Sequence, residues 1–201
     1  MKRVAALDFD RIYDEDPDPW KLESSRYERD KRAATLAALP GGPHPSTLEI
    51  GCASGVLTAA LAMRSTRVVA LDFSRRAVAM ARHRLAAADN VEVRLGSFPE
   101  DAPAGSWSVV VCSEVLYYLD PPALELAIAW LADQLAGGAT VVAVHWRGPA
   151  LTEPLRGDDV HDLMRVGLAR WHARDERRAR YRLDVFDGAE RPHRASRYRL
   201  I

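Results

Sequence analysis

The chain has 201 residues, and its 28 Lys and Arg residues balance 28 Asp and Glu residues, so the formal net charge at pH 7 is zero. This length favours a single domain with a substantial core. A zero net charge provides no long-range attraction to nucleic acid or to an anionic membrane, and we expect neither as a partner.

Segments that would target or anchor the protein are not expected. The apolar start at residues 4–7 is shorter than the roughly seven or more apolar residues of a signal peptide. No stretch approaches the roughly 18 apolar residues of a membrane span. Cys52 and Cys112 are expected to be reduced core residues, because intracellular chains with two thiols usually keep them reduced. We expect a cytoplasmic protein, either a monomer or a homodimer.

The first part of the chain is expected to be an arm. Residues 8–20 are acidic and contain two prolines, which predicts irregular structure. Apolar and aromatic residues recurring at helical spacing predict a helix over residues 24–39. The proline- and glycine-rich run at residues 40–45 then breaks the chain. Residues 1–40 are therefore assigned to an N-terminal arm and helix, and residues 46–201 to the core of the same domain.

After this break the pattern alternates between strands and helices. Asp120 and Ser74 are predicted helix N-caps, and Pro121 suits the first helical position. Two valine-rich strands are apolar without alternation, as expected for strands covered on both faces. The predicted strands are 47–50, 68–71, 91–95, 108–112 and 140–146, and the predicted helices are 56–62, 74–87 and 123–135. A helix over 158–174 and an edge hairpin of strands 178–186 and 195–201 complete the prediction.

These elements predict an α/β fold with a doubly wound, mostly parallel, seven-stranded sheet. In such a sheet, ligands bind at the carboxyl ends of the strands. The first strand runs into Gly51 and Gly55, where a backbone without Cβ atoms can approach a ligand closely. The next strand ends at Asp72, seventeen residues after Gly55, a spacing at which an acid often grips a ribose diol. This arrangement predicts a nucleotide-like cofactor.

The glycine spacing differs from the dinucleotide fingerprint, because Ala53 and Ser54 occupy the intervening positions. Glu49-x-Gly51-x-x-x-Gly55 instead resembles the first motif of class I S-adenosylmethionine (SAM) methyltransferases, with the middle glycine replaced by Ala53. The resemblance implies SAM as cofactor and S-adenosylhomocysteine (SAH) as product. It also implies that Glu49 supports the methionine end of SAM, although a carboxylate that merely pins the turn is an equal alternative.

The remaining strand ends supply further candidates. Family members often carry Gly-Asp after the third strand to meet the adenine amine, whereas this chain has Ser97, so the contact would come from its hydroxyl, from backbone or from Phe98 packing on the ring. Trp20 and Tyr27 are expected to cover the cofactor from the arm. The expected cofactor site comprises Glu49, Gly51, Cys52, Ala53, Gly55, Asp72, Phe73, Ser97, Phe98, Ser113, Trp20 and Tyr27.

The fourth and fifth strands are expected to form the acceptor side. Glu114 and His145 are the catalytic candidates, with His145 as first choice for a base; a structural role for His145 is the alternative. Glu114 would otherwise hold a cationic substrate. His161 is expected either to face the same cleft or to cap a helix. The expected substrate-binding residues are Tyr117, Tyr118, Trp146, Arg147 and His161. No metal is expected, because these histidines lack the spacing of a metal site.

A closer resemblance rests on several segments together. Asp18-Pro19-Trp20, Ser25-x-Tyr27-Glu28-x-x-Lys31, the segment from Ser113 to Leu119, His145-Trp146-Arg147 and Val160-His161-Asp162 resemble the nodulation protein S family of N-methyltransferases. This resemblance implies methyl transfer to a small-molecule amine, including an amino sugar or deacetylated glycan. O-methylation of a small molecule and SAM binding without turnover are the alternatives; an NAD-dependent oxidoreductase comes last because the glycine spacing disagrees.

Overall fold

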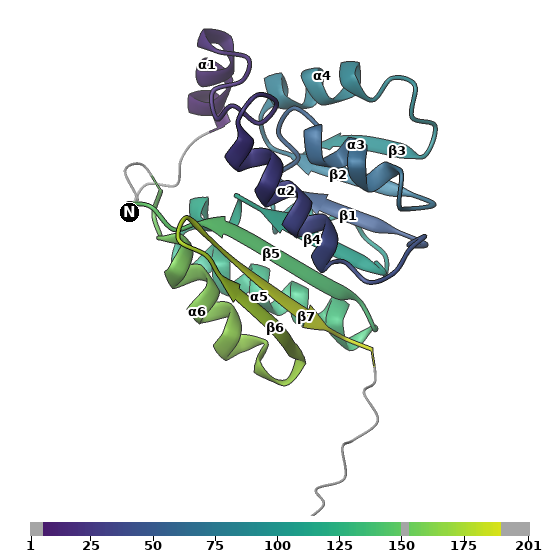
Figure 1. The fold of residues 1–201 in the computed structure, drawn as a ribbon, viewed down its shortest axis with the longest axis vertical. Coiled ribbons are helices and arrows are strands. Elements are labelled where there is room, and N and C mark those ends of the chain that lie inside the picture. Colours follow the sequence, from purple (N-terminus) through teal and green to yellow (C-terminus); the bar gives the residue numbers. More distant parts are fainter. Residues whose placement is uncertain (1–5, 150–152, 190–201) are drawn as a thin grey trace, which may run out of the picture.

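A seven-stranded sheet forms the centre of the computed structural model, which describes residues 6–149 and 153–189. Its strand order is β3-β2-β1-β4-β5-β7-β6 (Figure 1). The strands are β1 (Thr47–Ile50), β2 (Val68–Asp72), β3 (Val91–Leu95), β4 (Val109–Ser113), β5 (Thr140–Trp146), β6 (His172–Arg177) and β7 (Tyr181–Asp187). Strands β1 to β5 are parallel, and β7 runs antiparallel to both of its neighbours.

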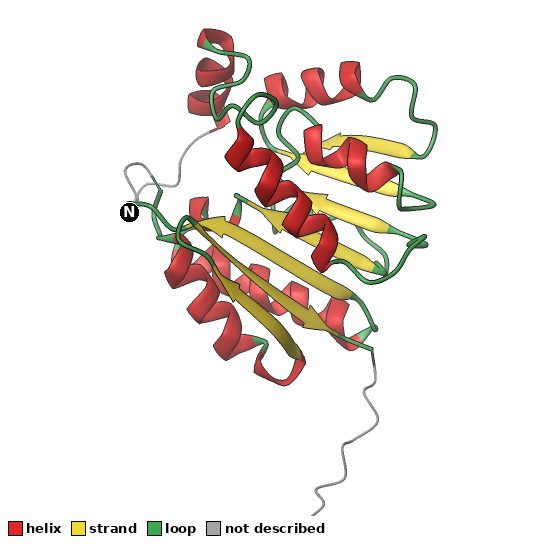
Figure 2. Ribbon diagram, in the orientation of Figure 1, coloured by secondary structure: helices red, strands yellow, loops and turns green. Residues whose placement is uncertain are grey.

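Helices cover both faces of the sheet (Figure 2). The helices are α1 (Ala6–Glu15), α2 (Arg26–Ala38), α3 (Val56–Ala62), α4 (Arg75–Arg84), α5 (Pro121–Ala136) and α6 (Gly157–Gly167), with short 3₁₀ turns η1 (Leu116–Tyr118) and η2 (Ala169–Trp171). One core packs α5 and α6 on the sheet, and two cores on the other face include residues of α2, α3 and α4. The predicted doubly wound α/β fold is therefore confirmed.

Local sequence features place two of these helices. The Ser74 hydroxyl accepts a hydrogen bond from the Ala77 N–H at 3.1 Å, which caps α4. The Asp120 carboxylate accepts one from the Ala123 N–H at 3.0 Å, which caps α5, with Pro121 at the first helical position. Each cap satisfies a backbone N–H that the helix itself leaves unpaired, and both predicted caps are confirmed.

The structure corrects the sequence prediction at both ends of the chain. Part of the arm predicted to be irregular is helix α1, whose Phe9 and Tyr13 are only 7% exposed. At the other end α6 stops at Gly167, and β6 takes up residues that the predicted helix 158–174 included. The charged sequence of β6 suits an exposed edge strand as well as a helix surface. The predicted strand 178–186 corresponds to β7, and 195–201 lies outside the described residues.

Among the residues that the structure describes, no helix has the length and apolar character needed to cross a membrane.

Candidate active site

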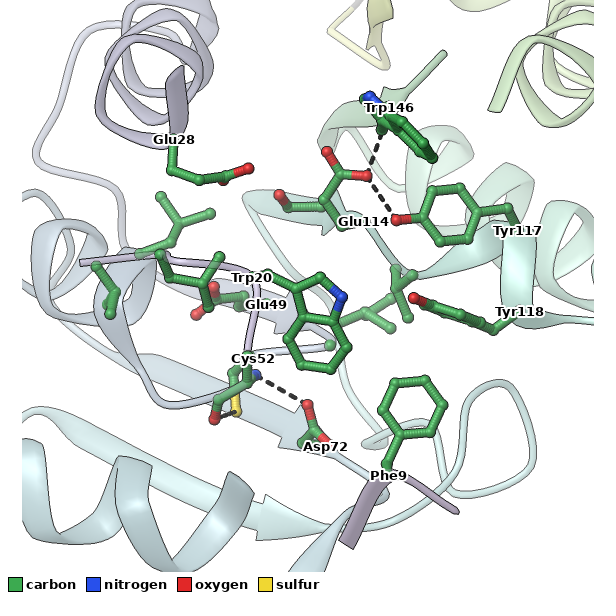
Figure 3. A pocket seen from close by; sticks show the side chains of 18 of the residues that line it. Phe9, Trp20, Glu28, Glu49, Cys52, Asp72, Glu114, Tyr117, Tyr118 and Trp146 are labelled. Atoms are coloured by element: carbon green, nitrogen blue, oxygen red, sulfur yellow. Dashed lines mark hydrogen bonds between the residues drawn. The ribbon is translucent and has the colours of Figure 1, made fainter. Parts of the chain in front are cut away.

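A cavity of about 500 Å³ lies over the carboxyl ends of β1, β2 and β4 and beneath the N-terminal arm (Figure 3). Most of the predicted site residues line it: Trp20, Tyr27, Glu49, Gly51, Cys52, Ala53, Asp72, Phe73, Ser97, Phe98, Ser113, Glu114, Tyr117, Tyr118 and Trp146. Its volume is in the range of small-molecule and cofactor sites. The arrangement matches the rule that ligands bind where parallel strands end.

The turn after β1 brings backbone against the cavity. Gly51 has φ +77°, and a Cβ atom there would lie 2.8 Å from the Cβ of Val115, so only glycine fits without displacement. Gly55 precedes α3 with φ +80° and does not line the cavity. Ala53 has φ +50°, a conformation that costs a non-glycine residue about 1–2 kcal/mol. The backbone thus keeps a glycine-like conformation where the methyltransferase motif usually has its middle glycine.

Asp72 is fixed by this turn at the end of β2. Its Oδ2 accepts a hydrogen bond from the Ala53 N–H at 2.8 Å, and its Oδ1 accepts one from the Ser74 N–H at 2.9 Å. Burial raises the pKa of Asp72 to about 6, although these backbone hydrogen bonds lower it. The carboxylate is therefore oriented and mainly ionised at neutral pH, with lone pairs left for a ligand in the cavity.

Glu49 is more deeply buried than Asp72, at 1% exposure. Its Oε2 accepts a hydrogen bond of 2.5 Å from the Thr58 hydroxyl of α3. Burial raises the pKa of Glu49 to about 8, so the carboxyl group is mainly protonated at pH 7. Glu49 both pins α3 to β1 and lines the cavity, so its two alternative roles are compatible.

The arm closes over the cavity through aromatic contacts that the sequence analysis did not identify. The Phe9 ring lies edge-on to Phe73 at 4.9 Å and to Tyr118 at 5.0 Å, and Tyr13 lies edge-on to Trp20 at 5.4 Å. Such edge-to-face pairs stabilise the closed arrangement. The spacing of Phe9 and Tyr13, one helical turn apart, was the available sequence signal.

Carboxylates on α1 hold the arm to the first turn of α4. The Asp10 carboxylate accepts hydrogen bonds from the Ser74 hydroxyl at 2.6 Å and from the Arg76 N–H at 3.1 Å. Asp14 also forms an ion pair with the Arg76 guanidinium at 2.7 Å. Acidic groups are favourable at a helix N-terminus, so these contacts define where α1 docks.

The other end of the cavity holds a charged cluster. The Lys31 ammonium donates to Glu28 Oε1 at 2.8 Å and to Glu114 Oε1 at 2.5 Å. Glu114 Oε2 accepts from the Tyr117 hydroxyl at 2.7 Å and from the Trp146 N–H at 2.8 Å, the arrangement drawn in Figure 3. Burial raises the pKa of Glu28. The cluster therefore combines two carboxyl groups with one ammonium at the cavity wall.

Glu28 and Lys31 belong to a family motif in the sequence but were not predicted as site residues. Their i, i+3 spacing places both on one face of α2, which was the signal that could have found them. Arg180, from the turn between β6 and β7, also lines the cavity and lies over the Tyr27 ring at 4.2 Å. No local sequence pattern predicts the contact between Arg180 and Tyr27, because these residues meet only in the folded chain.

The structure does not place His145 at the cavity, which corrects the leading catalytic assignment. Its side chain is fully buried and outside the residues that line the cavity. Its Nε2 accepts a hydrogen bond from the Leu116 N–H at 3.1 Å, and its Nδ1 lies 3.1 Å from His161 Nε2. Successive strand residues point to opposite faces, so the neighbouring Trp146 reaches the cavity and His145 points toward α6.

Two predicted substrate-binding residues are also turned away. His161 is fully buried, and its Nδ1 lies 2.7 Å from Asp184 Oδ2. Arg147 forms an ion pair with Asp158 at 3.0 Å and donates to the Arg178 carbonyl at 2.6 Å. Neither lines the cavity, because each is held by a partner on α6, β7 or the β6–β7 turn.

One group on β6 and β7 could hold a metal ion, away from the cavity. One ligand atom from each of His172, Asp175 and Asp184 lies within 4.8 Å of the others. Arg182 lies 3.5 Å from the Asp184 carboxylate, and Arg165 lies 3.7 Å from that of Asp175. These guanidinium groups compete with a cation, so we assign no metal role to this group.

Comparison of the sequence with known protein families identifies the family of this chain. The model of the family described as nodulation protein S (NodS) matches residues 9–147. The chain belongs to the nodulation protein S family. Nodulation protein S of Sinorhizobium fredii (strain NBRC 101917 / NGR234) is 31% identical over 127 residues, which are 62% of this chain and 59% of that protein. The alignment thus spans less than two thirds of that relative.

Other relatives share the fold. A ubiquinone biosynthesis O-methyltransferase of Xanthomonas campestris pv. campestris (strain B100) is 33% identical over 155 residues, 75% of this chain and 62% of that protein. The crystal structure of a putative methyltransferase from Pseudomonas syringae superposes with a TM-score of 0.71 at 35% identity, covering 81% of this chain and 99% of that one. The crystal structure of NodS from Bradyrhizobium japonicum WM9 in complex with SAH superposes with a TM-score of 0.77 at 22% identity. The match covers 93% of this chain and 100% of that one.

The fold is that of SAM-dependent methyltransferases, and the NodS structure that shares it contains SAH, the product form of the cofactor SAM. The cavity fits this cofactor on three observations. Its volume suits a molecule of this size, the Asp72 carboxylate is held ready to accept hydrogen bonds, and the Gly51 backbone lies at the cavity wall.

Proposed function

We propose that the protein transfers a methyl group from SAM to the nitrogen of a small-molecule amine. The cluster of Glu28, Lys31 and Glu114 at one end of the cavity carries this proposal. With Glu28 and Glu114 both ionised, their two negative charges exceed the one positive charge of Lys31, and all three side chains are at least partly buried. Such a site favours a substrate ammonium and can accept its proton.

The opposite end of the cavity is proposed to hold the cofactor. Asp72 would accept hydrogen bonds from the ribose hydroxyls, and Glu49 would lie at the methionine end. Phe73 and Phe98 offer apolar surface for the adenine, while Ser97 offers its hydroxyl. SAM, when bound, supplies a methyl group on a positively charged sulfur, which makes that carbon electrophilic.

The chain's own residues then position the acceptor, exclude water and manage one proton. The closed arm, with Phe9 and Trp20 at the cavity, excludes water from the reacting groups. An amine attacks with its lone pair, so an ammonium must first lose a proton. Among the described residues, Glu114 Oε2 accepts two hydrogen bonds and Oε1 only one, which leaves Oε1 as the oxygen to take that proton.

The comparisons support two classes of methyl acceptor. The solved NodS structure is described as that of an N-methyltransferase, which supports an amine, and the family resemblance implies an amino sugar or deacetylated glycan as the acceptor. The similarity to ubiquinone biosynthesis O-methyltransferases supports a second candidate, a hydroxyl acceptor whose proton Glu114 would also take. The charged cluster favours the amine, because an ionised ammonium gains more from two carboxyl groups than a neutral hydroxyl does.

Matched acceptors can separate these possibilities. The protein is incubated with methyl-deuterated SAM and with glucosamine, N-acetylglucosamine or glucose, and then with simple primary amines and the corresponding alcohols. We expect labelled methyl on the free amines and none on N-acetylglucosamine, whose nitrogen has no available lone pair. Label on the alcohols alone would establish O-methylation. SAM binding without any labelled product would favour a binding protein.

We predict that Asp72→Ala weakens both SAM and SAH binding. The variant removes hydrogen bonds between a charged carboxylate and the ribose hydroxyls, each worth roughly 1.5–3 kcal/mol, so the affinity should fall by about 10–150-fold. Isothermal titration calorimetry measures this directly. Asp133→Ala is the matched control, since Asp133 is an exposed acidic residue of α5 outside the cavity. Unchanged affinity in a folded Asp72→Ala variant would remove Asp72 from the site.

The affinity for SAH should also depend on pH. Binding requires the ionised form of Asp72, whose pKa burial raises to about 6, so affinity is full above this value and is lost as the pH falls through it. At pH 5 only about a tenth of the groups would be ionised, giving about tenfold weaker binding than at pH 7. Asp72→Ala should show no such change between these pH values. Equal wild-type affinities at pH 5 and 7 would contradict the assignment.

Cofactor binding should slow hydrogen exchange in the arm. Trp20 and Tyr27 line the cavity, so a bound ligand adds contacts to an arm otherwise held by a few polar and aromatic contacts. Exchange measured by mass spectrometry with and without SAH should show greater protection of residues 12–30 in the complex. Helix α5, which does not line the cavity, serves as internal reference. Equal protection of residues 12–30 in both states would rule out a closing arm.

A further inference from the structure

Three fully buried polar side chains connect β7 to the turn that carries Tyr117 and Tyr118. Asp184 Oδ2 lies 2.7 Å from His161 Nδ1, and His161 Nε2 lies 3.1 Å from His145 Nδ1. His145 Nε2 in turn lies 3.1 Å from the backbone nitrogen of Leu116, the first residue of η1. All three side chains are at 0% exposure. None of them lines the cavity, so the mechanism above leaves them without a role.

The chemistry of these groups gives the chain of hydrogen bonds one direction. A backbone N–H only donates, so His145 Nε2 must accept from Leu116. A neutral imidazole that accepts at Nε2 carries its proton on Nδ1, so His145 donates to His161 Nε2. By the same reasoning His161 carries its proton on Nδ1 and donates to Asp184. Every contact then has one donor and one acceptor.

A charged His161 does not fit this arrangement. Doubly protonated His161 would point its Nε2–H at the Nδ1–H of His145, so the 3.1 Å contact requires a neutral ring. Burial lowers the pKa of His145 well below its ordinary value, which keeps that ring neutral as well. Burial would raise the pKa of Asp184, but the hydrogen bond from His161 and nearby Arg182 outweigh it and lower this pKa. Asp184 is therefore the ionised end of the chain.

We propose that Asp184, His161 and His145 form a positioning relay that fixes the η1 turn and, through it, the acceptor end of the cavity. None of the three side chains lines the cavity, so the relay does not touch a bound substrate directly. Its influence reaches the cavity through η1, where the Tyr117 ring packs against the His145 ring at 5.3 Å and against Tyr118 at 4.7 Å. The Tyr117 hydroxyl then donates to Glu114, the proposed proton acceptor.

Close packing of α6 on β5 holds the relay together. A Cβ atom on Gly157, the first residue of α6, would lie 2.1 Å from the Trp146 carbonyl oxygen and 3.2 Å from the His145 Cβ. The absence of a side chain there lets α6 start directly against the end of β5. His161 follows one helical turn later, on the same face of α6, and meets His145.

The wild-type protein provides the first test, which needs no acceptor. Long-range ¹H–¹⁵N correlation spectra report which ring nitrogen carries the proton, and His145→Gln assigns the signals. We expect both His145 and His161 to be neutral with the proton on Nδ1. A proton on Nε2 of His145, or a doubly protonated His161, would overturn the relay.

Two variants of His161 then test its effect on η1. His161→Gln places an amide oxygen where Nε2 was, so it can still accept from His145. His161→Asn places its amide near Nδ1, so it can reach Asp184 but leaves His145 without an acceptor. Hydrogen exchange of residues 113–119 should be faster in the Asn variant than in the Gln variant. Equal exchange in the two variants would contradict the proposal.

Kinetics give the functional readout, which rests on the proposed function because Tyr117 and Glu114 must face the acceptor. With glucosamine, or whichever amine is methylated in the acceptor panel, His161→Asn should lower kcat/KM by about 10–100-fold, as expected for small misplacement of reacting groups. His161→Gln should recover most of this loss, and SAH affinity should be unchanged in both. Equal losses in the two variants would overturn the relay. If no amine is methylated, the proposed function fails, while the spectra and exchange still decide the relay.

Discussion

Glu114→Gln should lower kcat by about 10²–10⁴-fold, the range typical of losing a general acid–base group. The amide has the size of the carboxylate but cannot take the proton that the acceptor ammonium must lose. It also leaves the buried Lys31 with one carboxylate partner, Glu28, in place of two. SAM affinity should be nearly intact, because the proposed cofactor contacts lie around Asp72 and Glu49 at the other end of the cavity.

Steady-state kinetics combined with calorimetric SAH binding tests this prediction. Glu125→Gln is the matched control, since Glu125 is an exposed residue of α5 outside the cavity and makes the same change of charge. The control should keep wild-type kcat. A Glu114→Gln variant with wild-type kcat would show that the acceptor arrives deprotonated or that another group takes its proton. An equal fall in SAH affinity would place Glu114 in the cofactor site instead.

Gly51→Val should abolish measurable SAM binding and destabilise the fold. Left-handed backbone costs a side-chain-bearing residue about 1–2 kcal/mol, and overpacking typically adds about 1–3 kcal/mol. The new Cβ would lie 2.8 Å from the Cβ of Val115, which also lines the cavity, so the cavity wall at this turn must shift. The loss of affinity should exceed that of Asp72→Ala, because the turn that orients Asp72 must also shift.

Two other glycines separate strain from crowding in this experiment. Gly105 has φ +120° with nothing within 4 Å of an added Cβ, whereas Gly41 has open space and no positive φ. Gly105→Val should therefore lower the melting temperature without affecting SAM binding, and Gly41→Val should change neither. If Gly51→Val bound SAM as tightly as the wild type, the cofactor would not approach this turn.

Much of the fold follows from local sequence. The valine-rich strands, the Ser74 and Asp120 caps and the glycine turn each act over a few residues, so the sequence predicts them and the structure has them. The parallel sheet follows from the alternation of strands and helices along the chain. The predicted strand 178–186 corresponds to β7, whereas the start of β6 was predicted as helix, since the charged segment His172–Arg177 suits either an exposed strand or a helix surface.

The acceptor end of the cavity depends on tertiary contacts that the sequence does not display. His145 and Trp146 are neighbours at the end of β5, and only the pleat of the folded sheet decides which of them faces the cavity. Lys31 and Glu114 lie 83 positions apart and meet only when α2 packs on the sheet. Trp20 and Tyr27 of the arm line the cavity, but helix α1 and its carboxylate contacts to α4 depend on docking of the arm, which composition does not reveal.

The most direct measurement of the central claim is a crystal structure of the protein with SAH and an amine acceptor bound together. We expect the ribose hydroxyls within hydrogen-bond distance of the Asp72 carboxylate. We also expect the amine nitrogen between the cofactor sulfur and the Glu114 carboxylate, with the hydrogen bond from the Tyr117 hydroxyl to Glu114 retained. A ribose bound elsewhere, or an amine nitrogen with no contact to Glu114 or Glu28, would contradict the proposed assignment of the two ends of the cavity.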